Sequence, residues 1–257
     1  MGAVAATRSV VDRAREEQIT LLAASIAYYA FFSIIPLLLL VLAIGSLVGG
    51  QAFADRLVGL IGGQLSSQGQ TVVEQALTSP TGRGGASIVG VVGLLWGGLK
   101  VFRTVDVAFD QVYLVGEDSS LVRQVVDGVL VLFLVGLAVI VMVGLGAVIQ
   151  RAELVGIPGI SILGWIGMFV GLVVVFLPLF YVMPPVEVSF REVVPGTVFT
   201  VAGWIILQAG FQVYAANAGD YQAYGLLGAV LLFLTWLYFA GVLVLLGATI
   251  NAVLADR

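Results

Sequence analysis

Four charged residues lie close together in a chain that has few charges. They are Lys100, Arg103, Asp106 and Asp110. Their spacings of three, three and four residues place them along one side of a helix, with opposite charges at pairing distance. Two interpretations fit this pattern. The long basic side chains snorkel at a membrane interface, or the group faces a cavity inside a helix bundle, where ionisable residues mark the path of a substrate or ion.

A second polar group follows helical spacing within an otherwise apolar stretch. Its members, four, four and three residues apart, are Ser25, Tyr29, Ser33 and Pro36. This stripe lines a polar crevice or substrate path, or its hydroxyls bond to adjacent helices. Pro36 has no N–H to give to the carbonyl of Phe32, so it predicts a kink.

Two glutamines form a third polar group. Gln208 and Gln212 are four residues apart and point the same way on a helix. An amide without a partner is costly in hydrocarbon. We therefore expect this side of the helix to face other helices.

Several kinds of chemistry are excluded by absent residues. The chain has no Cys and no His, which rules out disulfides and metal sites built on thiolate or imidazole. Phosphodiester hydrolysis needs an acid and a base, or a metal-activated water. The best carboxylate pair, Asp106 and Asp110, has Lys100 and Arg103 as neighbours. No nucleotide-binding G-x-x-x-x-G-K-[ST] loop is present. We expect no catalytic residue, metal or cofactor, and no enzyme.

The composition predicts a membrane protein. Of 257 residues, 60% are hydrophobic and 10% charged, and the mean hydropathy is +1.12. Soluble domains carry about 25% charged residues. The net charge of −4 argues against a nucleic-acid partner, because affinity for phosphate backbones comes largely from clustered Lys and Arg.

Long apolar stretches predict six transmembrane helices in a single domain. The first, 21–48, has no charged residue. As a helix it would reach about 42 Å, more than a hydrocarbon core of about 30 Å. The other predicted spans are 86–105, 128–149, 162–182, 193–215 and 224–254. The fold class is therefore an all-α, polytopic membrane protein.

Two segments outside these spans have amphipathic patterns. Residues 1–20 predict a short interfacial helix, with a frayed, solvated terminus as the alternative. Residues 49–85 predict two short amphipathic helices on the membrane face, in the first outer loop.

An even number of spans puts both termini on one side. Basic residues on that side number eight against three opposite, which favours cytoplasmic termini. The eight are Arg8, Arg13, Arg15, Lys100, Arg103, Arg123, Arg191 and Arg257, and the three are Arg56, Arg83 and Arg151.

Three stretches carry a family pattern. They are 23–29 with 32–36, then Pro184, Pro185, Phe190, Arg191, Pro195 and Gly196, and last Tyr221, Tyr224, Gly225, 236–238, 246–248, Asn251 and Ala252. Together they resemble the YihY/virulence factor BrkB family of inner-membrane proteins, once named as ribonuclease BN. The resemblance covers nearly the whole chain in order. It implies six transmembrane helices in the plasma membrane, with no agreed biochemical activity.

The chain departs from this family pattern at two positions. Members often have Glu where this chain has Thr249, and Asn is usual where this chain has Asp110. A role of that glutamate cannot be carried over.

These features favour the handling or transport of a lipid-like amphiphile for the cell envelope, with membrane lipids as partners. One alternative is a non-catalytic scaffold that docks an envelope protein through 49–85. The ribonuclease of the old family name is a weaker alternative.

Overall fold

A computed structural model describes residues 2–33, 92, 100–115, 126–131, 133, 134, 136–138, 160–216 and 225–256. All regular structure in these residues is helical, as the all-α prediction requires. The chain divides into two compact units, Met1–Ala27 with Phe102–Arg257, and Tyr28–Val101. Most described residues belong to the first unit. The single transmembrane domain stays a prediction.

The N-terminal helix is amphipathic, as predicted. Helix α1 spans Ala3–Glu16; Val10 and Ala14 are partly buried, whereas Arg8 and Arg15 are exposed. The helix ends where Gln18 adopts a left-handed conformation with φ of 49°. A second, apolar helix follows over Ile19–Ser33. The amphipathic helix is thus separated from the apolar one by a tight break.

The helix over 100–112 ends beside α1. Leu114 takes a left-handed φ of 57°, and Val115 donates its N–H to the carbonyl of Asp110 at 3.0 Å. The guanidinium of Arg13 donates to the carbonyl of Val112 at 3.4 Å. A cation at a helix C-terminus is favourable because the last carbonyls carry partial negative charge.

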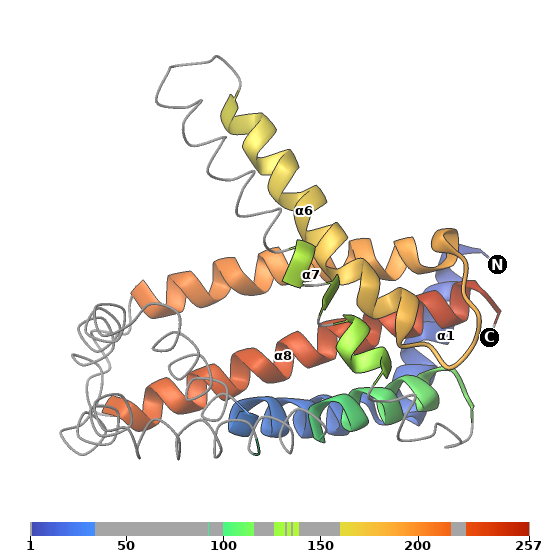
Figure 1. The fold of residues 1–257 in the computed structure, drawn as a ribbon, viewed down its shortest axis with the longest axis horizontal. Helices are drawn as coiled ribbons and strands as arrows, with labels where there is room; N and C mark the ends of the chain where they lie inside the picture. Colours follow the sequence, from blue (N-terminus) through green and yellow to red (C-terminus); the bar gives the residue numbers. More distant parts are fainter. Residues whose placement is uncertain are drawn as a thin grey trace. The chain divides into compact units, whose positions relative to one another are not determined.

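Three long helices form the C-terminal part (Figure 1). They are α6 (Ile160–Val182), α7 (Phe190–Ala216) and α8 (Gly225–Leu254). Pro184 and Pro185 follow α6, where consecutive prolines prevent its continuation. Pro195 lies inside α7 and removes the N–H that would pair with the carbonyl four residues earlier.

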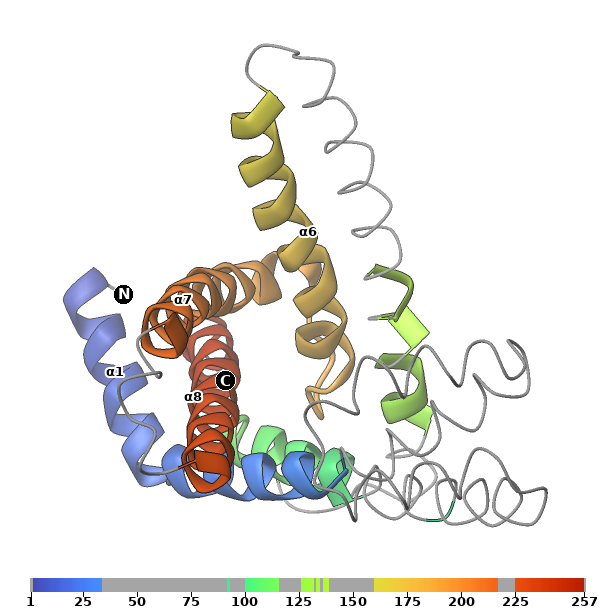
Figure 2. The ribbon, with the colours of Figure 1, turned by 90° about the vertical axis from the view of Figure 1, so that its left-hand side faces the viewer.

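Helices α7 and α8 are antiparallel neighbours (Figures 1 and 2). Near one end Gly196 bonds to Asn251, and farther along α7 the ring of Trp204 lies 5.1 Å from that of Trp236. On its other side Trp204 meets Phe176 of α6 at 5.0 Å. Aromatic side chains therefore connect α6, α7 and α8. They do so farther along α7 than the hydrogen bond between Gly196 and Asn251.

The core is built from several helices of the first unit, and Ala14 of α1 packs against it. Helices α6, α7 and α8 meet the helices over 19–33 and 100–112 through buried apolar side chains. The core residues are Ile19, Ala23, Ala108, Phe109, Val112, Tyr113, Val131, Phe180, Met183, Val193, Leu245, Ala248 and Ala252.

Among the residues that the structure describes, two helices have the length and composition to cross a membrane. They cover Phe190–Tyr214 and Val230–Leu254, and shorter apolar helices cover Ile19–Ser33, Val126–Ala138 and Ile166–Val182. Large apolar side chains on α7 are exposed, with Ile206 at 72% and Val213 at 66%. Such exposure suits contact with lipid and is unfavourable in water.

Helices α6, α7 and α8 lie where the predicted spans 162–182, 193–215 and 224–254 were placed. The spans predicted at 21–48, 86–105 and 128–149 are only partly within the described residues, so the count of six stays a prediction. The segment 49–85 and Pro36 lie outside the described residues.

Candidate functional site

The structure gives the four charged residues different environments. Asp106 and Asp110 are buried, with 6% and 3% exposure, whereas Arg103 is exposed and Lys100 partly buried. Along this helix the buried positions begin at Asp106. Phe109, one turn later, is fully buried. The exposed arginine is what the snorkelling interpretation predicts, and the buried carboxylates are what an interior placement predicts.

The serines of the polar stripe bond within their own helix. The hydroxyl of Ser25 donates to the carbonyl of Leu21 at 3.2 Å, and that of Ser33 donates to the carbonyl of Tyr29 at 2.8 Å. These bonds join residues four apart, so they connect no neighbouring helix. The buried positions on this helix are instead the apolar residues Ile19, Ala23 and Ala27.

The two glutamines predicted to face other helices lie on the surface of α7. Gln208 and Gln212 are both exposed on α7, although we expected this side to face other helices. The neighbours of the glutamines in sequence, Ala209, Gly210 and Val213, are also exposed. That this side faces other helices stays a prediction, because the segments 34–91 and 139–159 lie outside the described residues.

A polar contact joins α7 to α8 at two glycines. The N–H of Gly196 donates to Oδ1 of Asn251 at 2.7 Å in a fully buried position. A Cβ at Gly196 would collide with the carbonyl oxygen of Gly247, and one at Gly247 would collide with the hydroxyl of Thr200. The two backbones thus touch, which only residues without a side chain permit.

Threonine hydroxyls surround this glycine contact. Thr197, Thr200 and Thr249 are all fully buried. The hydroxyl of Thr200 donates to the carbonyl of Leu243 across the helices at 3.1 Å, and that of Thr249 donates to Leu245 within α8 at 2.8 Å. The threonine hydroxyls are thus used for helix packing, whereas Nδ2 of Asn251 is buried at the same contact without a hydrogen-bond partner in the described part of the chain.

An apolar cleft of about 560 Å³ opens beside this contact. It lies between α1 and the α7–α8 pair. Its lining residues are Ala6, Thr7, Val10, Val11, Phe199, Leu246, Ile250 and Leu254. Thr7 is the one polar residue of this lining, so the cleft is suited to an apolar chain and poorly suited to water.

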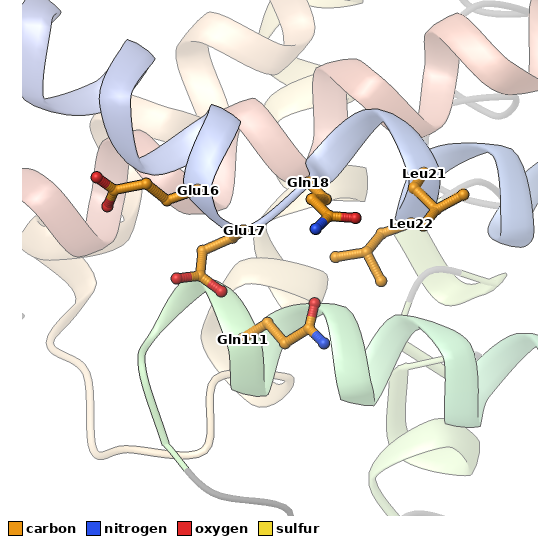
Figure 3. A pocket seen from close by; sticks show the side chains of 6 residues that line it. All are labelled: Glu16, Glu17, Gln18, Leu21, Leu22 and Gln111. Atoms are coloured by element: carbon orange, nitrogen blue, oxygen red, sulfur yellow. The ribbon is translucent and has the colours of Figure 1, made fainter.

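A smaller cavity of about 200 Å³ lies at the break after α1 (Figure 3). It is lined by Glu16, Glu17, Gln18, Leu21, Leu22 and Gln111. Within the described part of the chain, no group of three or more acidic, histidine or cysteine side chains is placed to hold a metal ion. Neither this cavity nor the apolar cleft is lined by the four charged residues.

Comparison with known proteins identifies the family. The family described as virulence factor BrkB matches residues 10–257. The chain belongs to this family. YfkH of Bacillus subtilis, named ribonuclease-like, is 26% identical over 247 residues, covering 91% of this chain and 89% of YfkH.

Two further relatives of this BrkB protein are named UPF0761 membrane proteins. The one from Alkalilimnicola ehrlichii is 29% identical over 96% of this chain, and the match covers 57% of that protein. The one from Pseudoalteromonas translucida is 24% identical over 96% of this chain and 85% of its own length. No solved structure matches the chain.

The stretches that carry the BrkB pattern meet in space. Gly196 of the second stretch contacts Gly247 and Asn251 of the third. Ala23 of the first stretch lies against Gly241 of α8, where an added Cβ would be 3.3 Å from it. These contacts were not predictable, because nothing in the sequence shows which helices are neighbours.

The two departures from the BrkB pattern fall at buried positions. Thr249, where members often have Glu, is fully buried beside the glycine contact, and Asp110 is 3% exposed. The apolar cleft was not predicted from the sequence. The signal that could have indicated it is the amphipathic pattern of α1, which predicts an apolar face packed against another element.

Proposed function

We propose that this BrkB-family membrane protein handles or transports a lipid-like amphiphile for the cell envelope. The observation that carries the proposal is the apolar cleft between α1 and the α7–α8 pair. Its volume of about 560 Å³ lies in the range of about 300–1,000 Å³ typical of small-ligand sites. The apolar part of a lipid is the ligand that this lining accommodates best.

The surroundings of the cleft support a membrane ligand. Two of its walls are α7 and α8, the helices that could cross a membrane. A lipid chain entering from the hydrocarbon would keep its apolar surroundings throughout. Burying it in the cleft therefore needs no exposure of its chain to water.

The alternatives have less support. Asp106 and Asp110 are buried within packed helices, which does not favour their contact with an RNA strand. We therefore propose a non-enzymatic role.

The second alternative is a scaffold that docks an envelope protein through 49–85. Residues 49–85 lie outside the described part of the chain, so no structural observation supports this alternative.

The expected setting is the plasma membrane, with six spans and both termini in the cytoplasm. This placement rests on the excess of basic residues on the N-terminal side. It would put α1 and the cleft at the cytoplasmic edge of the membrane.

Transbilayer movement of fluorescent lipid analogues in liposomes tests the proposal. Purified protein should speed this movement relative to protein-free vesicles. Ala6→Trp fills the cleft from α1, because Ala6 lines it, and should remove most of the added rate. Val4→Trp is the matched control, since Val4 is 85% exposed on the same helix and does not line the cleft.

Both variants should unfold at the temperature of the original protein. Equal rates with and without protein would contradict the proposal. Equal rates for Ala6→Trp and Val4→Trp would contradict the assignment to the cleft.

A further inference from the structure

The apolar cleft runs toward one end of α8. Leu246, Ile250 and Leu254 line it at spacings of four residues, so they form one side of that helix. Leu254 is the last residue of α8. The long wall of the cleft therefore reaches the end of the helix, where a membrane-spanning segment would meet the lipid headgroups.

The register of α7 and α8 places Arg191 at this end. Gly196 bonds to Asn251, and the helices are antiparallel. Arg191, five residues before Gly196 in the first turn of α7, is therefore level with about Asp256, which lies five residues beyond Asn251 and just past Leu254 at the end of α8.

Arg191 is exposed and has no ion pair with a described carboxylate. The neighbouring carboxylate of Glu192 accepts instead from the N–H of Ser189 at 3.3 Å. Two of the other described arginines are engaged: Arg8 lies 3.8 Å from Asp12, and Arg13 bonds to the carbonyl of Val112. Arg191 thus combines a guanidinium that has no ion pair with a described carboxylate and a level just beyond the α8 wall of the cleft.

We infer that Arg191 binds the phosphate of an anionic phospholipid whose acyl chain occupies the cleft. A planar guanidinium matches phosphate oxygens with paired N–H donors. At the end of a span its stem lies along apolar surface while the charge stays at headgroup level. This inference rests on the proposed function and adds the class of lipid that the cleft selects.

Photocrosslinking in phosphatidylcholine nanodiscs tests the inference. One probe is phosphatidylglycerol with a diazirine in its acyl chain, and the other is diacylglycerol with the same chain. Labelling is read by mass spectrometry at Phe199, Ile250 and Leu254, which line the cleft. Ile206, exposed on α7 and outside the cleft lining, gives the background.

In the original protein, phosphatidylglycerol should label the cleft about five- to tenfold more than diacylglycerol, as expected for charge-assisted hydrogen bonds. Arg191→Gln should bring this ratio near one without lowering diacylglycerol labelling. Arg191→Lys should keep part of it, because Lys binds phosphate as a point charge.

Arg15→Gln is the matched control, since Arg15 is exposed and has no ion pair with a described residue. It should leave the ratio unchanged. A ratio that survives Arg191→Gln would overturn the role of Arg191 while leaving the cleft as a lipid site. Cleft labelling at the Ile206 background with both probes would instead overturn the proposed function itself.

Discussion

Oδ1 of Asn251 accepts a hydrogen bond from the N–H of Gly196 at the contact between α7 and α8, and this bond is buried. Removing the Asn251 side chain would take away this hydrogen bond between the two helices. A hydrogen bond of this kind contributes about 0.5–1.5 kcal/mol to stability. At the residue scale, the helix pair is therefore sensitive to a few small and polar side chains, and far less to exposed ones.

Asn251→Ala should lower the free energy of unfolding by about 0.5–1.5 kcal/mol, because the hydrogen bond from the Gly196 N–H to Asn251 is lost. Thermal unfolding of the protein in detergent measures this. Ser25→Ala is the control, because the Ser25 hydroxyl bonds within its own helix in an exposed setting. Equal unfolding temperatures for Asn251→Ala and Ser25→Ala would show that the hydrogen bond from Gly196 does not stabilise the protein.

Gly247→Ala should lower the unfolding temperature, because a Cβ there collides with the Thr200 hydroxyl and approaches the backbone of Gly196. Overpacking of this kind costs about 1–3 kcal/mol. Gly210→Ala in α7 is the matched change, since a Cβ there has no atom within 4 Å. Its greater helix propensity should stabilise the protein slightly. A stable Gly247→Ala protein would contradict the close backbone contact.

At the scale of elements, the break between α1 and the helix over Ile19–Ser33 positions the amphipathic helix. A left-handed residue other than glycine sits at this break, as Gln18 has φ of 49°. The same residue lines the small cavity shown in Figure 3. The direction of α1, and with it one wall of the apolar cleft, depends on this turn.

Gln18→Val should destabilise the protein by about 1 kcal/mol, because a β-branched side chain is strained in the left-handed region. Gln18→Gly should not destabilise it, since glycine adopts this conformation without strain. Thr20→Val is the control, an exposed position just inside the next helix. Equal unfolding temperatures for Gln18→Val and Thr20→Val would exclude strain at this turn.

At the scale of the whole molecule, apolar surface is turned outward. Exposed side chains such as Phe133, Ile206 and Leu231 suit lipid as their surroundings. This exposed apolar surface would be unfavourable in water. It is therefore consistent with a membrane protein, as relatives of this chain are named. The side on which each loop lies is a separate matter, governed by the distribution of basic residues.

Cysteine labelling tests the topology, because the chain has no native cysteine. Ala5→Cys and Asp256→Cys should resist a membrane-impermeant thiol reagent in intact cells and react after permeabilisation. Arg151→Cys, in a predicted outer loop, should react in intact cells. Labelling of Ala5→Cys and Asp256→Cys from opposite sides would exclude an even number of spans.

Composition and hydropathy alone determined that this chain is a helical membrane protein, and where its last three long helices lie. These properties belong to local windows of about twenty residues, the length that crosses a bilayer. The amphipathic α1 was predictable for the same reason, since its pattern repeats within a few turns.

Only the tertiary structure decided which residues meet. Gly196 and Asn251 are 55 residues apart in sequence, and their contact depends on the antiparallel register of two helices. The exposure of Gln208 and Gln212, and the apolar cleft beside α1, depend in the same way on which helices are neighbours. A sequence pattern shows the face of each helix, but the partner of that face is set by packing between segments far apart in the chain.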